Sequence, residues 1–499
     1  MRNSITYVSI GLVALLFAGL GVGCGGDSVG RDDSPSPVSP LPDTATVAFV
    51  EPPVSGRTFW IDPVGGSPDG DGSAQRPWRT LQEVLDRRLV AYYGRQSSGD
   101  PQSPWVLHDS EAPVQGGDRL VLKSGYHGLV RRSQFCFRKW LHIEAAPGDT
   151  PVLSQFLITG TFEKIHLKGL RFRKEDWIPS DTAKGDERLW WKAQAINNAT
   201  GTLLELRNGL SGTPGREVVL QNLDLRSARD VSKWSAADWV DRAASGITVR
   251  SARKVSIHRC HLENVRFGIS IFEGSDSSMA LDNLVRRYSG DGFRLTSDWS
   301  RLERNRVEGC MKVDDNHDDG IQSWSSGEDG SLGNGIVRGN ILRDNVIVGI
   351  LDSTDPLRGS PQGIGAFDGF FESWVVERNV IVSNTHHGIT FYGMRNSRIS
   401  HNTVIDQVPG DDISPGIYVR AHKDGRESEN VTLNDNLAMA DASAKGPGMT
   451  ESGNMVIGKF AFQRLAWLFV DAFNGDVRLR SNDSTRAFLG SGDAGASRP

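Results

Sequence analysis

The chain has 499 residues, of which 38% are hydrophobic, 23% are charged and 56 are glycine. This length and composition exclude a small disulfide-stapled fold, a collagen and a chain that is disordered throughout. The net charge of −5 provides no positive field to hold a polyanion, so we expect no nucleic-acid partner.

The first 24 residues have the pattern of an export signal. Arg2 precedes an apolar run from Ile5 to Leu20, and small residues then lead to Cys24. This pattern resembles a bacterial lipoprotein signal, which implies lipidation of Cys24, a membrane partner through that anchor and a location in the bacterial cell envelope. Ordinary signal cleavage with secretion is the alternative. Residues 25–45 are rich in Gly, Ser, Pro and Asp and are predicted to form a disordered linker.

From about residue 220 the chain repeats one unit, made of a short β-branched run, an Asn, a second run, then Gly and an alternating strand. The Asn positions lie 22 or 23 residues apart where no loop intervenes. They are Asn283, Asn305, Asn340, Asn379, Asn402 and Asn436, and Cys260 fills the equivalent place one unit earlier. Asn tolerates left-handed backbone and its amide can hydrogen-bond along a stack, so this period predicts a parallel β-helix with three strands and three turns per coil.

The repeat resembles the right-handed parallel β-helix superfamily of secreted carbohydrate-active proteins, which includes pectate and alginate lyases. Residues 57–85 look like the opening segment of such proteins, and residues 468–495 resemble their closing segment. The resemblance implies an all-β right-handed parallel β-helix over residues 46–499, active on a polysaccharide, and we expect a monomer. Residues 86–115 and 172–245 do not keep the period and are predicted to be inserted helices or loops that wall a groove.

The strands that follow one turn share a Gly and then an apolar residue, as in DDGIQSW at 318–324. Because Ile321 must point into the core, the residues at alternate positions around it should point outward. Six aligned strands give three predicted outward columns. The first holds Arg266, Gly290, Asp318, Pro361, His386 and Ser414; the second Ser270, Arg294, Gln322, Gly365, Thr390 and Tyr418; the third Phe272, Thr296, Trp324, Phe367, Tyr392 and Arg420. An aromatic column on an exposed face predicts stacking on sugar rings.

Residues 313–324 hold the densest group of acidic side chains. Carboxylates this close together predict either a calcium site formed by Asp315, Asp318 and Asp319 or carboxyls with separated pKa values for acid and base roles. Capping of turn backbone groups is the purely structural alternative. The segment around His317 is also similar to the Asp-Pro-His-Asp signature of mannuronan carbon-5 epimerases, with Asn316 in place of the proline.

A lyase or carbon-5 epimerase removes the proton beside a uronate carboxylate, and it needs a base and a group that neutralises that carboxylate. The outward columns and the acidic segment offer these parts, so this reaction on an acidic glycan is our first functional prediction. The predicted catalytic residues are His386, Tyr392, Arg294, Arg420, Asp318 and His317, and the predicted substrate-binding residues are Gln322, Trp324, Tyr418, Phe367 and Lys423.

Two alternatives remain. The order GDG at 290–292, HDDG at 317–320, HHG at 386–388 and YVRAHK at 418–423 resembles that of the polygalacturonases, which implies inverting glycoside hydrolysis. One additional coil stands between the second and third elements, which ranks hydrolysis second. A non-catalytic, glycan-binding surface adhesin is the third reading. No phosphate-binding glycine loop opens a helix, so calcium is the one cofactor that the sequence predicts.

Overall fold

The computed structural model describes residues 41–480 apart from 44, 46, 98–99, 101, 175–200, 210–214, 409–412, 459–464 and 466–468. The signal with Cys24, most of the linker at 25–45, Trp177, Trp190 and Trp191, and much of the segment 468–495 lie outside the described residues. The described residues belong to a unit that runs from Ser39 to Pro499. None of their helices has the length and apolar character of a membrane span.

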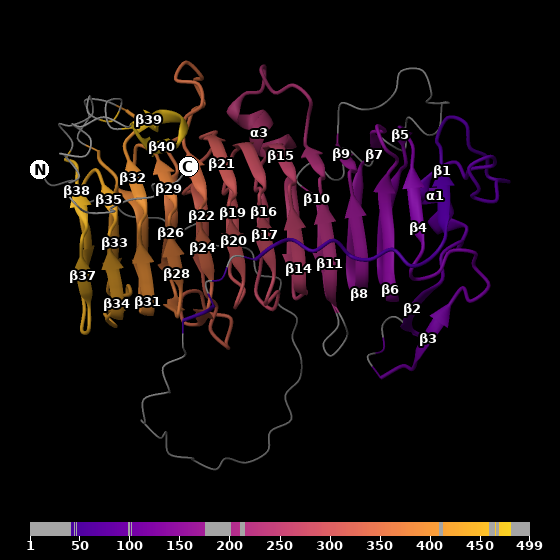
Figure 1. Ribbon diagram of the computed structural model, residues 1–499, viewed down its shortest axis with the longest axis horizontal. Coiled ribbons are helices and arrows are strands. Elements are labelled where there is room, and N and C mark those ends of the chain that lie inside the picture. The colour runs from indigo at the N-terminus through magenta and orange to yellow at the C-terminus, as the bar shows by residue number, and fades with distance from the viewer. Residues whose placement is uncertain are drawn as a thin grey trace, which may run out of the picture. The chain divides into compact units, whose positions relative to one another are not determined.

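The described chain winds as a parallel β-helix, and successive coils add strands to three ladders (Figure 1). The first ladder contains β10 (Thr202–Arg207), β13 (Ser245–Arg250), β16 (Ile269–Ile271), β19 (Phe293–Leu295), β22 (Asp319–Trp324), β26 (Gln362–Asp368), β30 (His387–Tyr392), β33 (Gly416–Arg420) and β36 (Ala442–Ala444). This ladder carries the outward residues that the sequence singles out.

The second ladder contains β1 (Thr58–Ile61), β4 (Arg119–Leu122), β11 (Gly215–Gln221), β14 (Arg253–His258), β17 (Met279–Leu281), β20 (Arg301–Glu303), β24 (Ile341–Arg343), β28 (Val375–Glu377), β31 (Met394–Ser400), β34 (Glu429–Asn434) and β37 (Thr450–Ser452). The long strands β6 (Leu129–Ala145) and β8 (Gln155–Lys168) serve both ladders, because their pairing shifts register midway. A short side ladder of β23 (Ile336–Arg338) and β27 (Phe370–Glu372) joins β31.

The third ladder contains β5 (Gly125–Tyr126), β7 (Pro151–Leu153), β9 (Arg171–Arg173), β12 (Asp224–Arg226), β15 (His261–Val265), β18 (Leu284–Tyr288), β21 (Arg306–Cys310), β25 (Val346–Val348), β29 (Val380–Val382), β32 (Thr403–Ile405), β35 (Leu437–Ala438) and β38 (Met455–Val456). The apolar side chains of the three ladders fill one continuous core. Each fully buried Ile, Leu, Val or Phe contributes about 1.5–3 kcal/mol of transfer free energy.

An asparagine ladder runs through the turn before the third ladder and confirms the predicted stack. Its members are Asn283, Asn305, Asn345, Asn379, Asn402, Asn436 and Asn454, and each amide before Asn454 donates to the next at 2.9–3.0 Å. The prediction of Asn340 was wrong. Asn345 takes that rung, because Val346 pairs with Arg306 in the third ladder, whereas Asn340 accepts from the backbone N–H of Ser300 in another turn.

The left-handed residue of this turn is the one before each asparagine, not the asparagine itself. Asp282, Arg304, Asp344 and Arg378 have φ of 54–58°. Their charges alternate along the stack, and Arg304 Nε lies 2.7 Å from Asp282 Oδ1 while Arg378 Nε lies 2.8 Å from Asp344 Oδ1. These ion pairs between coils offset part of the strain of a left-handed, non-glycine residue.

Two predicted insertions prove to be partly regular. Residues 86–115 contain an antiparallel hairpin of β2 (Tyr92–Arg95) and β3 (Trp105–His108), after the short helix α1 (Leu81–Asp86). Within 172–245, strands β10, β11 and β12 belong to the three ladders, so the prediction of an insertion is wrong for them. The described non-coil part holds helix α3 (Ala236–Arg242), which begins with a capping box between Ser235 and Asp238.

The segment before β1 crosses the outside of the second ladder as a strap of residue 45 and residues 47–56, drawn in indigo in Figure 1. Ala45 O accepts from Arg301, the Phe49 ring stacks on His258 with centroids 4.1 Å apart, and Glu51 pairs with Lys168 at 2.6 Å. Farther along the strap, Pro53 O lies 3.2 Å from His142 Nε2. As the strap runs from Ala45 to Pro53, it therefore contacts later coils first and earlier coils last.

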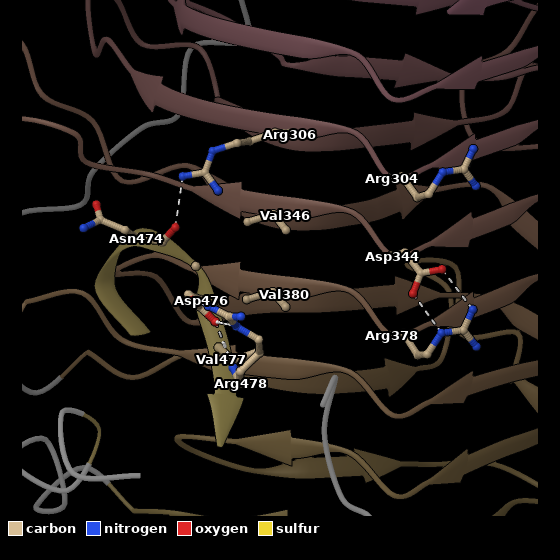
Figure 2. Close-up of a pocket in the computed structure, with 11 residues that line it drawn as sticks. Arg304, Arg306, Asp344, Val346, Arg378, Val380, Asn474, Asp476, Val477 and Arg478 are labelled. Carbon is tan, nitrogen blue, oxygen red and sulfur yellow. Dashed lines mark hydrogen bonds and ion pairs between the residues drawn. The ribbon is translucent and has the colours of Figure 1, made fainter. Parts of the chain in front are cut away.

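Near the C-terminus, a hairpin of β39 (Phe469–Asp471), the 3-10 turn η2 (Ala472–Asn474) and β40 (Asp476–Leu479) lies against the third ladder over a cavity (Figure 2). Four arginines line this cavity, and each is in an ion pair. Arg304 pairs with Asp282, Arg306 with Glu308, Arg378 with Asp344 and Arg478 with Asp476.

Candidate active site

The strands of the first ladder from β16 to β33 stand in the register that the sequence predicts. Their inward residues are 0–1% exposed and lie side by side; these are Ile269, Phe293, Ile321, Ile364, Ile389 and Ile417. The second predicted column follows one residue later, as Ser270, Arg294, Gln322, Gly365, Thr390 and Tyr418. We call the outer surface of these strands, together with the adjoining β10 and β13, the site face.

The first predicted column is displaced by one residue, because the shared glycine breaks the strict alternation. A Cβ on Gly320 would meet Ile347 Cγ2 of the core at 2.6 Å and Gly363 O of the next coil at 2.8 Å. The glycine therefore faces the core, as Ile321 beside it does, and the residue before the glycine points outward. On four successive coils this residue is Asp291, Asp319, Gln362 and His387.

Asp291 and Asp319 are buried in contact with the second column. Arg294 Nε donates to Asp291 Oδ2 at 2.6 Å, Gln322 Nε2 donates to Asp319 Oδ2 at 3.2 Å, and the Asp319 N–H donates to Asp291 Oδ1 at 3.1 Å. Burial, then repulsion by Asp291 and Asp318, raises the pKa of Asp319 well above its ordinary value. Burial also raises the pKa of Asp291, but Arg294 opposes that shift. Asp319 is therefore the member that keeps its proton and Asp291 the member that ionises.

Gly365 leaves the space that the Asp319 carboxyl occupies. A Cβ at this position would lie 2.1 Å from Asp319 Oδ1 and 3.0 Å from Gln362 Oε1. Both oxygens are buried and make no hydrogen bond among the described residues. Any side chain at position 365 would therefore push this carboxyl out of its place.

Asp318 lies at the edge of the site face and is 6% exposed. Asn316 Nδ2 donates to its Oδ1 at 3.1 Å, and Lys312 Nζ lies 3.5 Å from its Oδ2. Burial, with a contribution from the charge of Asp291, raises the pKa of Asp318 to about 6 against the opposing effects of Asn316 and Lys312. This carboxyl is therefore partly protonated near neutral pH, as a general acid must be.

Three histidines lie near this edge. His317 and His386 are exposed, while His387 is half-buried and its Nδ1 lies 3.1 Å from Thr390 Oγ1. Burial, with the charges of His386 and His317, lowers the pKa of His387. His387 is thus neutral at neutral pH and able to accept a proton. The sequence prediction placed His386, and not His387, among the catalytic residues, although HHG at 386–388 places His387 directly before the glycine.

The predicted aromatic column is split into two pairs. The Phe272 and Trp324 ring centroids lie 6.0 Å apart, and those of Phe367 and Tyr392 lie 5.2 Å apart. A register shift after Ser323 places Trp324 opposite Asp368 instead of Phe367. The site face therefore offers two separate aromatic surfaces for sugar rings.

The cations at the far end of the site face are already bound. Arg420 donates to Ser443 O and Oγ at 2.8 Å, and its guanidinium lies 4.9 Å from the centroid of the Tyr418 ring. Lys423 pairs with Asp368 at 2.6 Å. Burial, with the charge of Asp441, raises the pKa of Tyr418, which keeps this phenol protonated. Neither cation is left to neutralise a uronate without breaking a contact.

The predicted calcium ligands do not converge. Asp315 is exposed, whereas Asp318 and Asp319 are buried. No group of three His, Cys, Asp or Glu side chains suited to a metal ion occurs within the described ranges. Calcium binding at these residues stays a prediction.

The described part of the insertion supports the acidic loop. Trp234 and Trp239 form a small buried cluster with Met311, and Val313 packs against it. Arg266 Nη2 also holds Asp314 Oδ2 at 2.9 Å. Both tryptophans are thus structural residues under the loop, not surfaces for sugars. The cavities under the C-terminal hairpin and beside α1 lie away from the site face.

Comparison with known families gives one match, between residues 232–358 and a right-handed β-helix region. This match and the parallel ladders confirm the predicted fold, a right-handed parallel β-helix. A comparison with curated proteins gives no match.

Solved structures with a similar fold include a rhamnogalacturonan lyase, with 13% identity over 88% of this chain and 100% of that chain at a TM-score of 0.43. A pectate lyase has 12% identity over 86% of this chain and 90% of that chain, with a TM-score of 0.40. The periplasmic alginate epimerase AlgG has 12% identity over 76% and 82% of the two chains, with a TM-score of 0.39.

Proposed function

We propose that this protein is an enzyme that cleaves a polysaccharide by inverting glycoside hydrolysis, with Asp318 as the general acid. The observation that supports this most is a carboxyl with a pKa of about 6 at the edge of the site face, beside two buried carboxyls. Carboxyls whose pKa values are driven apart are the means by which glycosidases assign acid and base roles.

In this mechanism Asp318 donates its proton to the glycosidic oxygen as the bond breaks. Asp291 ionises before Asp319 because Arg294 holds it at 2.6 Å, and it accepts the proton of the attacking water once glycan binding opens its buried carboxylate to that water. Asp319 stays protonated, and its burial beside Asp291 discourages a second negative charge. Trp324 offers its ring to a sugar, and the Gln322 amide offers hydrogen bonds to its hydroxyl groups.

A lyase or carbon-5 epimerase is the second candidate, although the sequence alone ranks it first. The order changes because Arg294 is bound to Asp291 and Arg420 to Ser443, so neither is a free partner for a uronate carboxylate. The observation in its favour is His387, whose lowered pKa suits a base, on the same face as Tyr392.

We also retain the proposal that residues 1–24 direct export, that Cys24 is lipidated and that the protein works as a monomer in the cell envelope. Membrane fractionation of the Cys24→Ser variant tests the anchor, which predicts release from the membrane. Light scattering of the purified chain tests the monomer.

The reaction is tested by incubating the protein with polygalacturonate, alginate, glycosaminoglycans and neutral glycans. Hydrolysis releases reducing ends without the absorbance of unsaturated uronate, whereas a lyase produces both and an epimerase changes the epimer ratio at constant length. Asp318→Asn should lower kcat by about 100-fold or more, and Asp329→Asn, an exposed acidic residue of a nearby loop, should not. Binding without turnover on every glycan would instead identify an adhesin.

A further inference from the structure

Two arginines stand in register near the start of the site face. Arg207 of β10 and Arg250 of β13 are direct partners on neighbouring parallel strands. Like charges in this arrangement repel, so a sheet keeps them where a negative group offsets the repulsion. Glu205 does so for Arg207, with Nε and Oε1 3.5 Å apart. Arg250 has no ion-pair partner within 4.0 Å among the described residues; Glu205 and Glu273 attract it only from a greater distance.

Arg250 is held in place by an aromatic ring instead of a carboxylate. Its guanidinium carbon lies 4.2 Å from the centroid of the Phe272 ring, on the next coil. Phe272 is in turn next to Trp324, the predicted sugar platform. Arg250 is itself exposed. A guanidinium fixed against a ring keeps its planar fork of donors available, and this fork fits the two oxygens of a carboxylate or a sulfate.

The arginines around the C-terminal cavity and two further arginines of the site face differ from Arg250 in this respect. The four around the C-terminal cavity are all ion-paired. On the site face, Arg294 is bound to Asp291 and Arg420 to Ser443. Among the described residues of the site face, Arg250 is thus an arginine whose donors are open to a ligand.

We propose that Arg250, positioned by Phe272 and reinforced by the charge of Arg207, binds an anionic substituent of a glycan that lies along the site face. The coil of Arg250 precedes that of Asp319 by three coils, about 14 Å along the stack, and the register aligns Arg250 with Trp324, about 16 Å along the strand from Asp319. The two offsets together place the bound anion about 22 Å from Asp319. Because one sugar of an extended chain has a rise close to the strand spacing of about 4.8 Å, the anion belongs to a residue about four or five sugars from the bond that is cleaved, on a glycan that crosses the site face diagonally. This inference rests on the proposed function and adds that the substrate is acidic.

The test measures binding in the Asp318→Asn background, so that no substrate is consumed. Isothermal titration uses oligosaccharides of polygalacturonate, a sulfated glycosaminoglycan and a neutral glycan. Arg250→Ala should weaken binding of the acidic ligand by about tenfold or more and should reduce its dependence on salt. Arg250→Lys should recover only part of the affinity, because an ammonium lacks the planar fork. Binding of the neutral glycan should not change.

Arg253→Ala is the matched control, since this arginine is 69% exposed, pairs with Asp276 and belongs to the second ladder. Equal losses in the Arg250 and Arg253 variants, or equal affinity for acidic and neutral glycans, would overturn the inference. A preference between the uronate and the sulfated ligand identifies the anion. If Arg250 governs binding but no glycan is cleaved by the unmodified chain, the inference stands and the proposed function fails. If a neutral glycan is cleaved and Arg250→Ala has no effect, the proposed function stands and the inference fails.

Discussion

Replacing Asn345 by Ala should remove a rung from the middle of the asparagine ladder. Its amide donates to Leu302 O at 2.8 Å and to Asn379 Oδ1 at 2.9 Å, and its Oδ1 accepts from the backbone and side chain of Asn305 at 3.0 Å. Asn305 is only 2% exposed, so its N–H would be left without a partner and without water. That orphaned donor costs about 1–3 kcal/mol, and each remaining lost bond costs about 1 kcal/mol.

The expected loss is therefore about 4–6 kcal/mol in the free energy of unfolding, measured by denaturant titration with circular dichroism and tryptophan fluorescence. Asn454→Ala provides the comparison, because Asn454 is the last rung and is half-exposed, so water can replace its bonds to Asn436 and Leu433. We expect a loss of about 1 kcal/mol there. Equal losses in the two variants, or a loss below about 1 kcal/mol for Asn345→Ala, would show that the buried asparagine ladder does not make this contribution to the free energy of unfolding.

Four further outcomes are expected. Because the pKa of Asp318 is raised from 3.8 to about 6, activity that depends on its proton should fall as pH rises above about 6, and a pH–rate profile without this limb would exclude the role. Burial lowers the pKa of His166 from 6.5 to about 4, so the stability that the neutral ring supports should be lost as pH falls through this window; His166→Gln should flatten that dependence in melting experiments. Gly365→Ala should lower both turnover and the melting temperature, because the new Cβ overlaps the buried Asp319 Oδ1 and overpacking a buried site costs about 1–3 kcal/mol; full activity at an unchanged melting temperature would contradict the packing described. If Asp315, Asp318 and Asp319 bind calcium, titration of chelator-treated protein should give saturable heat that Asp315→Asn removes; an absence of heat in the unmodified protein would refute the site.

The sequence predicts the core of the first ladder correctly because its signal is local. One glycine and one apolar residue recur on six strands, and the register of Ile321, Ile364 and Ile389 follows from them. The same local signal does not predict which residue before the glycine points outward. Strict alternation assumes a regular strand, whereas Gly320 faces the core beside Ile321.

The choice between Asn340 and Asn345 shows a similar limit. Both follow a short turn and precede an apolar pair, and only the pairing of the next strands separates them. A usable signal does exist, because Asn345 follows a charged left-handed residue, Asp344, as Asn379 follows Arg378. Asn340 follows Gly339 instead.

The chemistry of the site depends on contacts that no sequence pattern contains. The sequence predicts Arg294 to be an unpaired cation, whereas in the structure its Nε donates to Asp291 Oδ2 at 2.6 Å. The raised pKa of Asp318 likewise results from burial and from a charge on the preceding coil. Residue types on a face can therefore be predicted from the sequence, but which of them are already bound to one another cannot.

The strap has a mechanical consequence. Its contacts are arranged in series, from Arg301 at Ala45 through His258 and Lys168 to His142 at Pro53. A force that lifts the chain at Ala45 away from the sheet breaks these contacts one after another. Only one contact therefore resists the force at any moment. The coils are held by many hydrogen bonds loaded together. Under a pull from the N-terminal side, the strap would detach first and add its length to the predicted linker while the site face kept its shape.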